Sequence, residues 1–187
     1  MRYFKLLKEY HDDSEIFCFC ENDCGREQYE LLEGRVISNW NESPVFYYNP
    51  SEGDNTVDYV HNDLSWFIIS SKFKSILENI DKGSVQYLSV DIKDNENNNL
   101  LKGYTVANII NVVDAIDYTH SIYSVFELED EKVYNFTKYA LKESEIKGHI
   151  FKLKGDEIPI FVSEKVKELI EQHNITGCDF LEVKVVS

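Results

Sequence analysis

The sequence predicts an α+β fold in a single domain that spans residues 1–187. The chain is 187 residues long and 43% hydrophobic, which suits one domain with a sizeable core. Short alternating apolar segments before residue 64 indicate a β-rich N-terminal lobe, residues 1–63. Residues 64–187 contain the same strand–helix–strand pattern twice, so we expect a second lobe that holds two repeat units.

Strands are expected in the N-terminal lobe wherever aromatic and β-branched residues form short runs bounded by turn residues. These runs cover residues 2–7, 16–20, 35–40 and 45–48. The segment 27–32 is helical at most. The sequence thus predicts a lobe made mainly of sheet.

The two repeat units align without a gap when residues 66–92 are shifted by 93 positions onto residues 159–185. Each unit opens with a short apolar strand that ends in a serine, Ser70 in the first and Ser163 in the second. A serine hydroxyl at this position accepts a hydrogen bond from the first free N–H groups of a helix. We therefore expect both serines to cap the helix that follows.

A helix with one apolar face is predicted in each unit. In the first unit, Phe73, Ile76 and Leu77 fall at i, i+3 and i+4 and form one stripe. Gly83 and Gly177 then end the two helices, because glycine readily adopts the left-handed conformation found after a helix. An alternating strand follows each glycine.

Four segments lie between the repeat units. Residues 94–99 are rich in Asn and Asp and predict a turn. Residues 104–116 are apolar and β-branched, which indicates a strand or a buried helix. Residues 133–146 read as an amphipathic helix, and residues 149–153 read as a strand.

The charge of the chain is strongly negative and unevenly distributed. Lys and Arg number 19 against 34 Asp and Glu, a formal net charge of −15. Residues 9–63 contain 14 acidic and two basic residues, whereas the other 132 residues contain 20 and 17. Such a charge repels phosphates, so we expect neither a nucleic-acid ligand nor a membrane partner. The acidic segment serves either as a solubilising face or as a surface for a basic partner.

No membrane anchor or export signal is expected from the sequence. The longest stretch without charged residues, 103–113, has 11 residues, whereas a spanning helix needs about 20. The N-terminus carries no apolar run of secretory-signal length. We therefore expect a soluble, cytoplasmic protein.

Three cysteines, Cys18, Cys20 and Cys24, lie within seven residues. Structural zinc sites use paired C-x₂-C units, and the spacing here is C-x-C-x₃-C. On a strand Cys18 and Cys20 face the same way and can fill space in the core. We expect no metal and no disulfide here.

One acidic triplet, Asp114, Asp117 and His120, has the pattern D-x-x-D-x-x-H. On a helix these side chains share one face, where they can hold a divalent metal or act as acid and base. No nucleophile elbow, P-loop, dinucleotide fingerprint or H-E-x-x-H motif occurs. We therefore expect no enzymatic activity and no cofactor, and the triplet remains the only basis for an enzyme.

Several segments together resemble one family, the eleventh-numbered immunity family of bacterial polymorphic-toxin systems, formerly a domain of unknown function. The resemblance spans most of the chain in the expected order. It rests on Leu32-Glu33-Gly34-Arg35-Val36-Ile37, Trp66-Phe67-Ile68-Ile69-Ser70, residues 104–117, Ser121, Ile160-Phe161-Val162-Ser163 and Thr176-Gly177-Cys178-Asp179-Phe180.

The resemblance implies a cytoplasmic protein that binds a cognate toxin domain and neutralises it by occupancy. It implies no catalytic residue. Because toxins that degrade nucleic acid carry basic clefts, we expect a basic toxin, such as a nuclease, to meet the acidic lobe. The expected contacts are Asp12, Asp13, Glu15, Asp23, Trp40, Glu42, Tyr47, Tyr48, Glu52, Asp54 and Asp58.

Two other functions stay open from the sequence. The first is a metal-dependent enzyme that uses Asp114, Asp117 and His120. The second is an acidic scaffold or nucleic-acid mimic without a toxin partner. A toxin gene beside the gene for this protein favours the immunity function over both.

Overall fold

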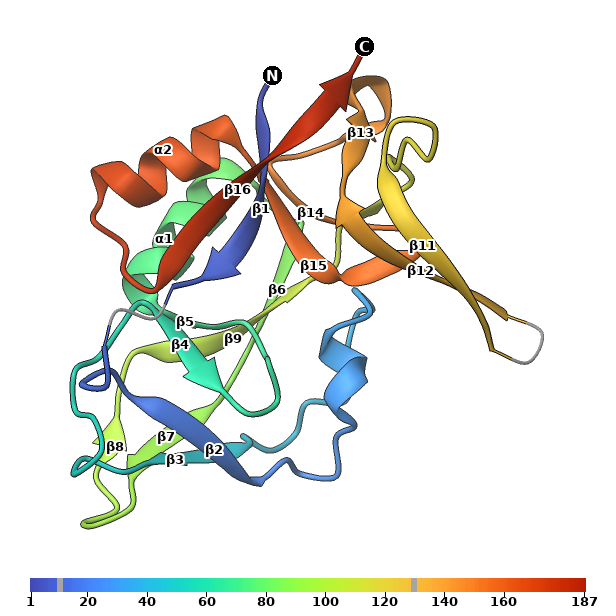
Figure 1. The fold of residues 1–187 in the computed structure, drawn as a ribbon. Coiled ribbons are helices and arrows are strands. Elements are labelled where there is room, and N and C mark those ends of the chain that lie inside the picture. Colours follow the sequence, from blue (N-terminus) through green and yellow to red (C-terminus); the bar gives the residue numbers. More distant parts are fainter. Residues whose placement is uncertain (10–11, 129–130) are drawn as a thin grey trace.

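The computed structural model describes residues 1–9, 12–128 and 131–187. Two twisted sheets, a separate β-hairpin and two α-helices make up this part of the chain (Figure 1). The helices lie side by side, one packed against each sheet, and the hairpin projects away from them (Figure 1). The fold is therefore α+β, as expected.

The six-stranded sheet combines the two ends of the chain. The N-terminal strand lies near its centre, antiparallel to both neighbouring strands. In spatial order the strands are β10 (Val112–Val113), β14 (Ile150–Leu153), β15 (Asp156–Ser163), β1 (Tyr3–Lys8), β16 (Cys178–Val186) and β13 (Ala140–Lys142).

The eight-stranded sheet is built from residues 17–109. It holds most of the expected acidic lobe together with the first repeat unit. In spatial order its strands are β6 (Val85–Leu88), β9 (Tyr104–Ile109), β5 (Ile68–Ser70), β4 (Tyr59–Asn62), β2 (Phe17–Asn22), β3 (Val45–Tyr48), β7 (Asp91–Asp94) and β8 (Leu100–Leu101).

Each segment of the sequence repeat contains a strand, a helix and a strand. Helix α1 (Ser71–Ile80) connects β5 to β6, and helix α2 (Glu164–Gln172) connects β15 to β16. In both cases the two strands flank a third strand, which is β9 in one sheet and β1 in the other. The division expected after residue 63 does not coincide with a sheet boundary, because β4 pairs with β5 across it and β1 lies in the other sheet.

The two serines before the helices play different roles. Ser70 caps α1, since its hydroxyl accepts a hydrogen bond from the Phe73 N–H at 3.2 Å. Ser163 occupies the same position before α2, but its hydroxyl bonds to the His149 ring at 2.9 Å. The expected side-chain cap at Ser163 is therefore wrong.

The helix expected at residues 133–146 is also wrong. This segment forms most of β12 (Glu131–Lys138), which pairs with β11 (Ile122–Leu128), and then β13 and a short 3₁₀ turn, Glu143–Glu145. A register shift in the hairpin places Phe136 and Tyr139 near each other, with ring centroids 5.0 Å apart. Because of this irregularity, two apolar side chains three positions apart lie together in a strand, although this spacing is typical of a helix.

The strand expected at residues 35–40 does not form. The Gln86 side chain accepts from the Ile37 N–H at 2.9 Å and donates to the Ile37 carbonyl at 2.6 Å. Asn108 donates to the Arg35 carbonyl at 2.7 Å. Side-chain amides thus take the place of a strand partner for this segment. The strands expected at 2–7, 16–20, 45–48 and 149–153 are confirmed. Of the two structures expected at 104–116, a strand or a buried helix, the strand forms, as β9 and β10.

Candidate functional site

Strand β2 carries two exposed phenylalanines next to two inward cysteines. Cys18 is fully buried, while Phe17 and Phe19 are 41% and 56% exposed. Their rings lie against each other on the outer face, with centroids 4.9 Å apart. The alternation that the sequence shows is present, and phenylalanine occupies the solvent side. Two adjacent aromatic rings in water are unusual unless a partner covers them.

Neighbouring strands extend this apolar surface. Tyr47 on β3 lies opposite Phe19, and His61 on β4 lies opposite Phe17. Residues opposite each other in paired strands point to the same face of a sheet. We call Phe17, Phe19, Tyr47 and His61 the aromatic stripe. The His61 ring is fixed by a hydrogen bond between Nε2 and the Glu9 carbonyl at 2.9 Å.

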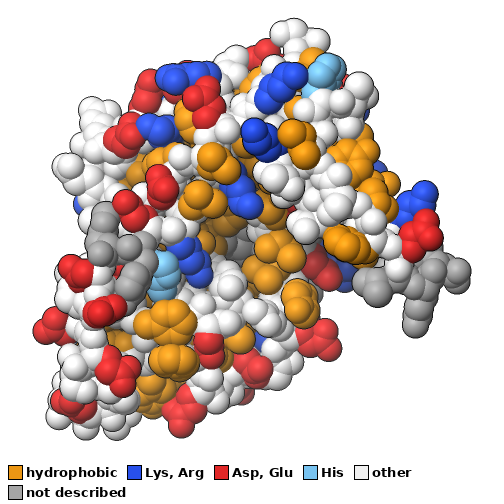
Figure 2. Space-filling model, in the orientation of Figure 1, with side chains coloured by type: hydrophobic (Ala, Val, Ile, Leu, Met, Phe, Trp, Pro, Cys, Tyr) orange, Lys and Arg blue, Asp and Glu red, His pale blue; other side chains and the backbone are white. Residues whose placement is uncertain are grey.

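Acidic side chains lie around the aromatic stripe. Glu21 continues the outward face of β2 and lines a shallow hollow with Phe19 and Tyr47. Asp63 accepts a hydrogen bond from the Cys20 N–H at 3.0 Å, which holds it beside β2. Figure 2 shows hydrophobic side chains on the lower, eight-stranded part of the molecule with Asp and Glu around them. Eight of the exposed acids of this lobe, called here the acidic surface, are Asp12, Asp13, Glu21, Asp23, Glu42, Glu52, Asp54 and Asp63.

Two of the acids expected as partner contacts serve the fold instead. Glu15 is only 4% exposed and bridges to Asn55, so it is not available to a partner. The Asp58 carboxylate accepts from the Ser70 hydroxyl and from the Thr176 N–H, the latter at 3.0 Å. These bonds connect the two sheets. The structure thus removes Glu15 as a surface contact and gives Asp58 a structural role.

Of the three aromatic anchors expected, only Tyr47 lies on the aromatic stripe. Trp40 is half-buried and packs on Trp66, with ring centroids 6.0 Å apart. Its indole N–H donates a hydrogen bond to the Ser89 carbonyl at 3.0 Å. Tyr48 points to the other face of β3 and packs against the core of the eight-stranded sheet. Burial raises the pKa of the Tyr48 phenol. Trp40 and Tyr48 therefore anchor the fold.

The clustered cysteines, Cys18, Cys20 and Cys24, are free thiols. Burial raises the pKa of Cys18 to about 12 and that of Cys20 to about 11. All four cysteines are free, and within the described ranges no three His, Cys, Asp or Glu side chains are placed to hold a metal ion. A protonated thiol is a poor nucleophile and a poor metal ligand. Cys18 is a core residue.

The acidic triplet lies in a loop and not on a helix. Asp117 accepts from the N–H groups of Thr119 and His120, at 2.9 and 3.1 Å, and from the His120 ring at 2.9 Å. These hydrogen bonds, led by the one from the ring, hold the pKa of Asp117 below its usual range. Asp114 is exposed and pairs with Lys154 at 3.6 Å. The carboxylate of Asp117 thus organises a turn.

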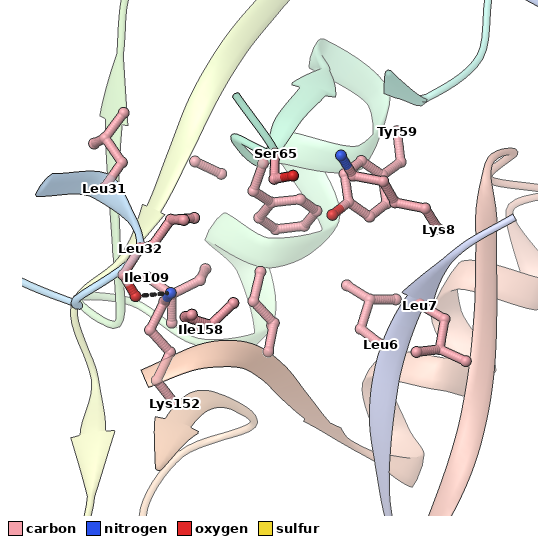
Figure 3. Close-up of a pocket in the computed structure, with 13 residues that line it drawn as sticks. Leu6, Leu7, Lys8, Leu31, Leu32, Tyr59, Ser65, Ile109, Lys152 and Ile158 are labelled. Carbon is pink, nitrogen blue, oxygen red and sulfur yellow. Dashed lines mark hydrogen bonds between the residues drawn. The ribbon is translucent and has the colours of Figure 1, made fainter. Parts of the chain in front are cut away.

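A small apolar cavity of about 190 Å³ lies between the two sheets (Figure 3). Two lysines line it. Lys152 donates to the carbonyls of Leu32 and Glu157, each at 2.7 Å, and the Lys8 ammonium lies over the Tyr59 ring at 5.3 Å. Burial lowers the pKa of both lysines to about 8.

Comparison with protein families decides the identity of the chain. The sequence model of one family, described as the immunity protein family (Imm11), matches residues 4–185. The chain belongs to the Imm11 immunity protein family. No curated protein matches it. Membership of Imm11 implies a toxin partner and an inhibitory role.

The Imm11 match covers both sheets, the hairpin and both helices, so the whole described fold belongs to the family. Within the described residues, the two helices are too short and too polar to cross a bilayer. The exposed phenylalanines of β2 are the site residues that the sequence did not single out. The sequence signal for their outward position is in the neighbouring residues. Along the strand, the charged Glu21 shares the face of Phe17 and Phe19, and the apolar Ile16 shares the face of Cys18.

Proposed function

We propose that this protein neutralises a cognate polymorphic-toxin domain in the cytoplasm by covering it with the aromatic stripe and the acidic surface. Family membership supports an immunity role, and the exposed pair Phe17–Phe19 is the observation that carries the choice of surface. Inhibition by occupancy needs only binding.

The two parts of this surface make different contributions. Exposed aromatic side chains provide most of the binding energy when a partner desolvates them, and a surrounding ring of polar residues excludes water. The acidic surface attracts a basic partner and raises the association rate at low salt. Both properties suit a basic toxin such as a nuclease, whose cleft for phosphate carries lysine and arginine.

The proposal is tested with the toxin domain encoded beside the gene for this protein. We expect coexpression of the full chain to restore growth of cells that produce the toxin domain, and the two proteins to copurify in a fixed ratio. A complex that leaves the toxin fully active contradicts neutralisation. Failure of the two proteins to copurify contradicts occupancy.

A further inference from the structure

A cleft lies on the six-stranded sheet, where two strands separate. Strand β13 pairs in parallel with β16 from Ala140 opposite Lys184 onward. Before this point the chain of β12 diverges from β16, and a cavity of about 550 Å³ opens between them. This volume falls in the range of ligand-binding pockets. The hairpin forms one wall, and Figure 1 shows that it projects beyond the six-stranded sheet.

The strands on both sides of the cleft have free edges. Residues 178–183 of β16 pair with β1 on one side, and no strand of the described residues pairs with them on the other. Strand β12 pairs with β11 on one side, and its other edge has no strand partner in the described part of the chain. Free edges present N–H and C=O groups without a strand partner, which an added strand can satisfy. On β16 the Phe180 N–H donates to the Asp179 side chain at 2.7 Å, a bond that an added strand would replace.

The side chains that line the cleft are cationic and apolar. Three lysines, Lys5, Lys138 and Lys184, line the cleft together with His120 and one acid, Glu182. Two more carboxylates contact lining residues, Asp117 at the His120 ring and Asp156 at the Tyr139 hydroxyl. The excess of lysines over acids in the lining is the reverse of the whole chain, whose net charge is −15. The apolar part consists of Ile122, Phe136, Tyr139, Leu181 and Val183.

The floor of the cleft is fixed by contacts, and its rim is exposed. The rings of Phe136 and Tyr139 stack at 5.0 Å, and the Tyr139 hydroxyl donates to Asp156 at 2.6 Å, which fixes the floor. Leu181 is 53% exposed at the rim. The His120 Nδ1 is hydrogen-bonded to the Asp117 carboxylate, so the other ring nitrogen of His120, Nε2, is the one that can contact a ligand.

We propose that this cleft binds an extended acidic peptide segment of a protein partner, which adds as a strand to β16 or β12. The free edges supply main-chain hydrogen bonds, and the lysines select carboxylate side chains. The apolar floor accommodates the side chains that alternate with the acids. The site is separate from the aromatic stripe and does not depend on the toxin surface proposed above.

The test uses the peptide acetyl-Ile-Glu-Val-Asp-Val-amide and the full protein labelled with ¹⁵N. We expect the peptide to shift the amide resonances of residues 136–139 and 181–184. We expect binding to weaken about tenfold when Gln and Asn replace the two acids of the peptide. The double variant K138E/K184E is expected to lose affinity by a similar factor, while K147E/K165E, which reverses two exposed lysines elsewhere, binds as the wild type does.

Three results overturn the proposal. The first is the absence of shifts at these amides at about 1 mM peptide, a concentration that reveals even weak binding. The second is equal loss of affinity in K138E/K184E and in K147E/K165E. The third is a cleft that binds the anionic amphiphile decanoate but not the peptide, which identifies a small-molecule site instead.

Discussion

The Lys152 ammonium donates a hydrogen bond to the Leu32 carbonyl at 2.7 Å and thereby links two distant parts of the chain. Lys152 lies on β14 of the six-stranded sheet, and Leu32 lies between β2 and β3, two strands of the eight-stranded sheet. The lysine is only 2% exposed, and burial lowers its pKa to about 8. A charged group is therefore buried at the join between the sheets, held by two carbonyls.

The low pKa of Lys152 predicts a pH-dependent stability. Between pH 8 and about 10 the unfolded state binds more protons at this lysine than the folded state does, so the free energy of unfolding rises with pH. Lys152→Met removes this contribution. The stability difference between wild type and variant is expected to shift in favour of the wild type by up to about 1 kcal/mol per pH unit in this window.

Urea unfolding of wild type and Lys152→Met at several pH values measures this difference. Lys154→Met is the control, because Lys154 is exposed and pairs with the exposed Asp114. A stability difference between wild type and Lys152→Met that does not change from pH 8 to pH 10 contradicts the burial of a titrating ammonium.

Gly177 and Gly83 lie in the loops that follow the two helices and have positive φ angles of 79° and 94°. A Cβ on Gly177 meets the Tyr59 carbonyl oxygen at 2.6 Å, whereas a Cβ on Gly83 meets nothing within 4 Å. Gly83→Ala is expected to cost about 1 kcal/mol from backbone strain alone. Gly177→Ala should cost about 2 kcal/mol more. Equal costs in denaturant unfolding contradict the close approach at Gly177.

Asp117 and Asp114 are expected to respond differently to replacement by asparagine. Asp117→Asn loses the charged acceptor of three hydrogen bonds, so it should lower the unfolding free energy measurably. Asp114→Asn should stay within about 0.5 kcal/mol of wild type. Thermal unfolding with and without magnesium, manganese or zinc is the check. Metal-dependent stabilisation that both variants abolish supports the metal-enzyme alternative instead.

Charge reversal on the acidic surface should act on association kinetics. The double variant Glu21→Lys/Asp54→Lys is expected to lower the association rate of the toxin domain about tenfold at low salt. The effect should shrink at high salt because ions screen exposed charges. Glu145→Lys/Glu168→Lys changes the net charge equally on other parts of the molecule. If stopped-flow measurements give the same association rate for both double variants, the net charge of the protein sets the rate and the acidic surface has no specific role.

The sequence predicted most strands because their apolar residues alternate and their ends carry turn residues. It failed where side chains replaced backbone partners, as Gln86 does for Ile37. It also failed at the hairpin, where the three-residue spacing of Phe136 and Tyr139 indicated a helix. In the structure a register shift brings these two side chains together in a strand. Pairings between distant segments, such as β1 between β15 and β16, have no local signal.

The candidate site was predictable in charge but not in its apolar part. The excess of acids in residues 9–63 is visible in the sequence, and most of the expected acids are exposed. Glu15 is an exception, because a charged residue in sequence carries no sign that its backbone enters a bridge. The pattern Phe-Cys-Phe-Cys by itself fits either face of a strand, and only the flanking residues Ile16 and Glu21 indicate that Phe17 and Phe19 point outward.

The central claim is that the aromatic stripe contacts the toxin, and the affinity of two serine variants tests it most directly. Phe19 and Phe126 are 56% and 55% exposed, the first on the stripe and the second on the hairpin. Calorimetric titration with the toxin domain should show Phe19→Ser weakened by about 2 kcal/mol, roughly thirtyfold, and Phe126→Ser unchanged. Wild-type affinity in Phe19→Ser together with loss in Phe126→Ser would place the toxin on the hairpin and contradict the account.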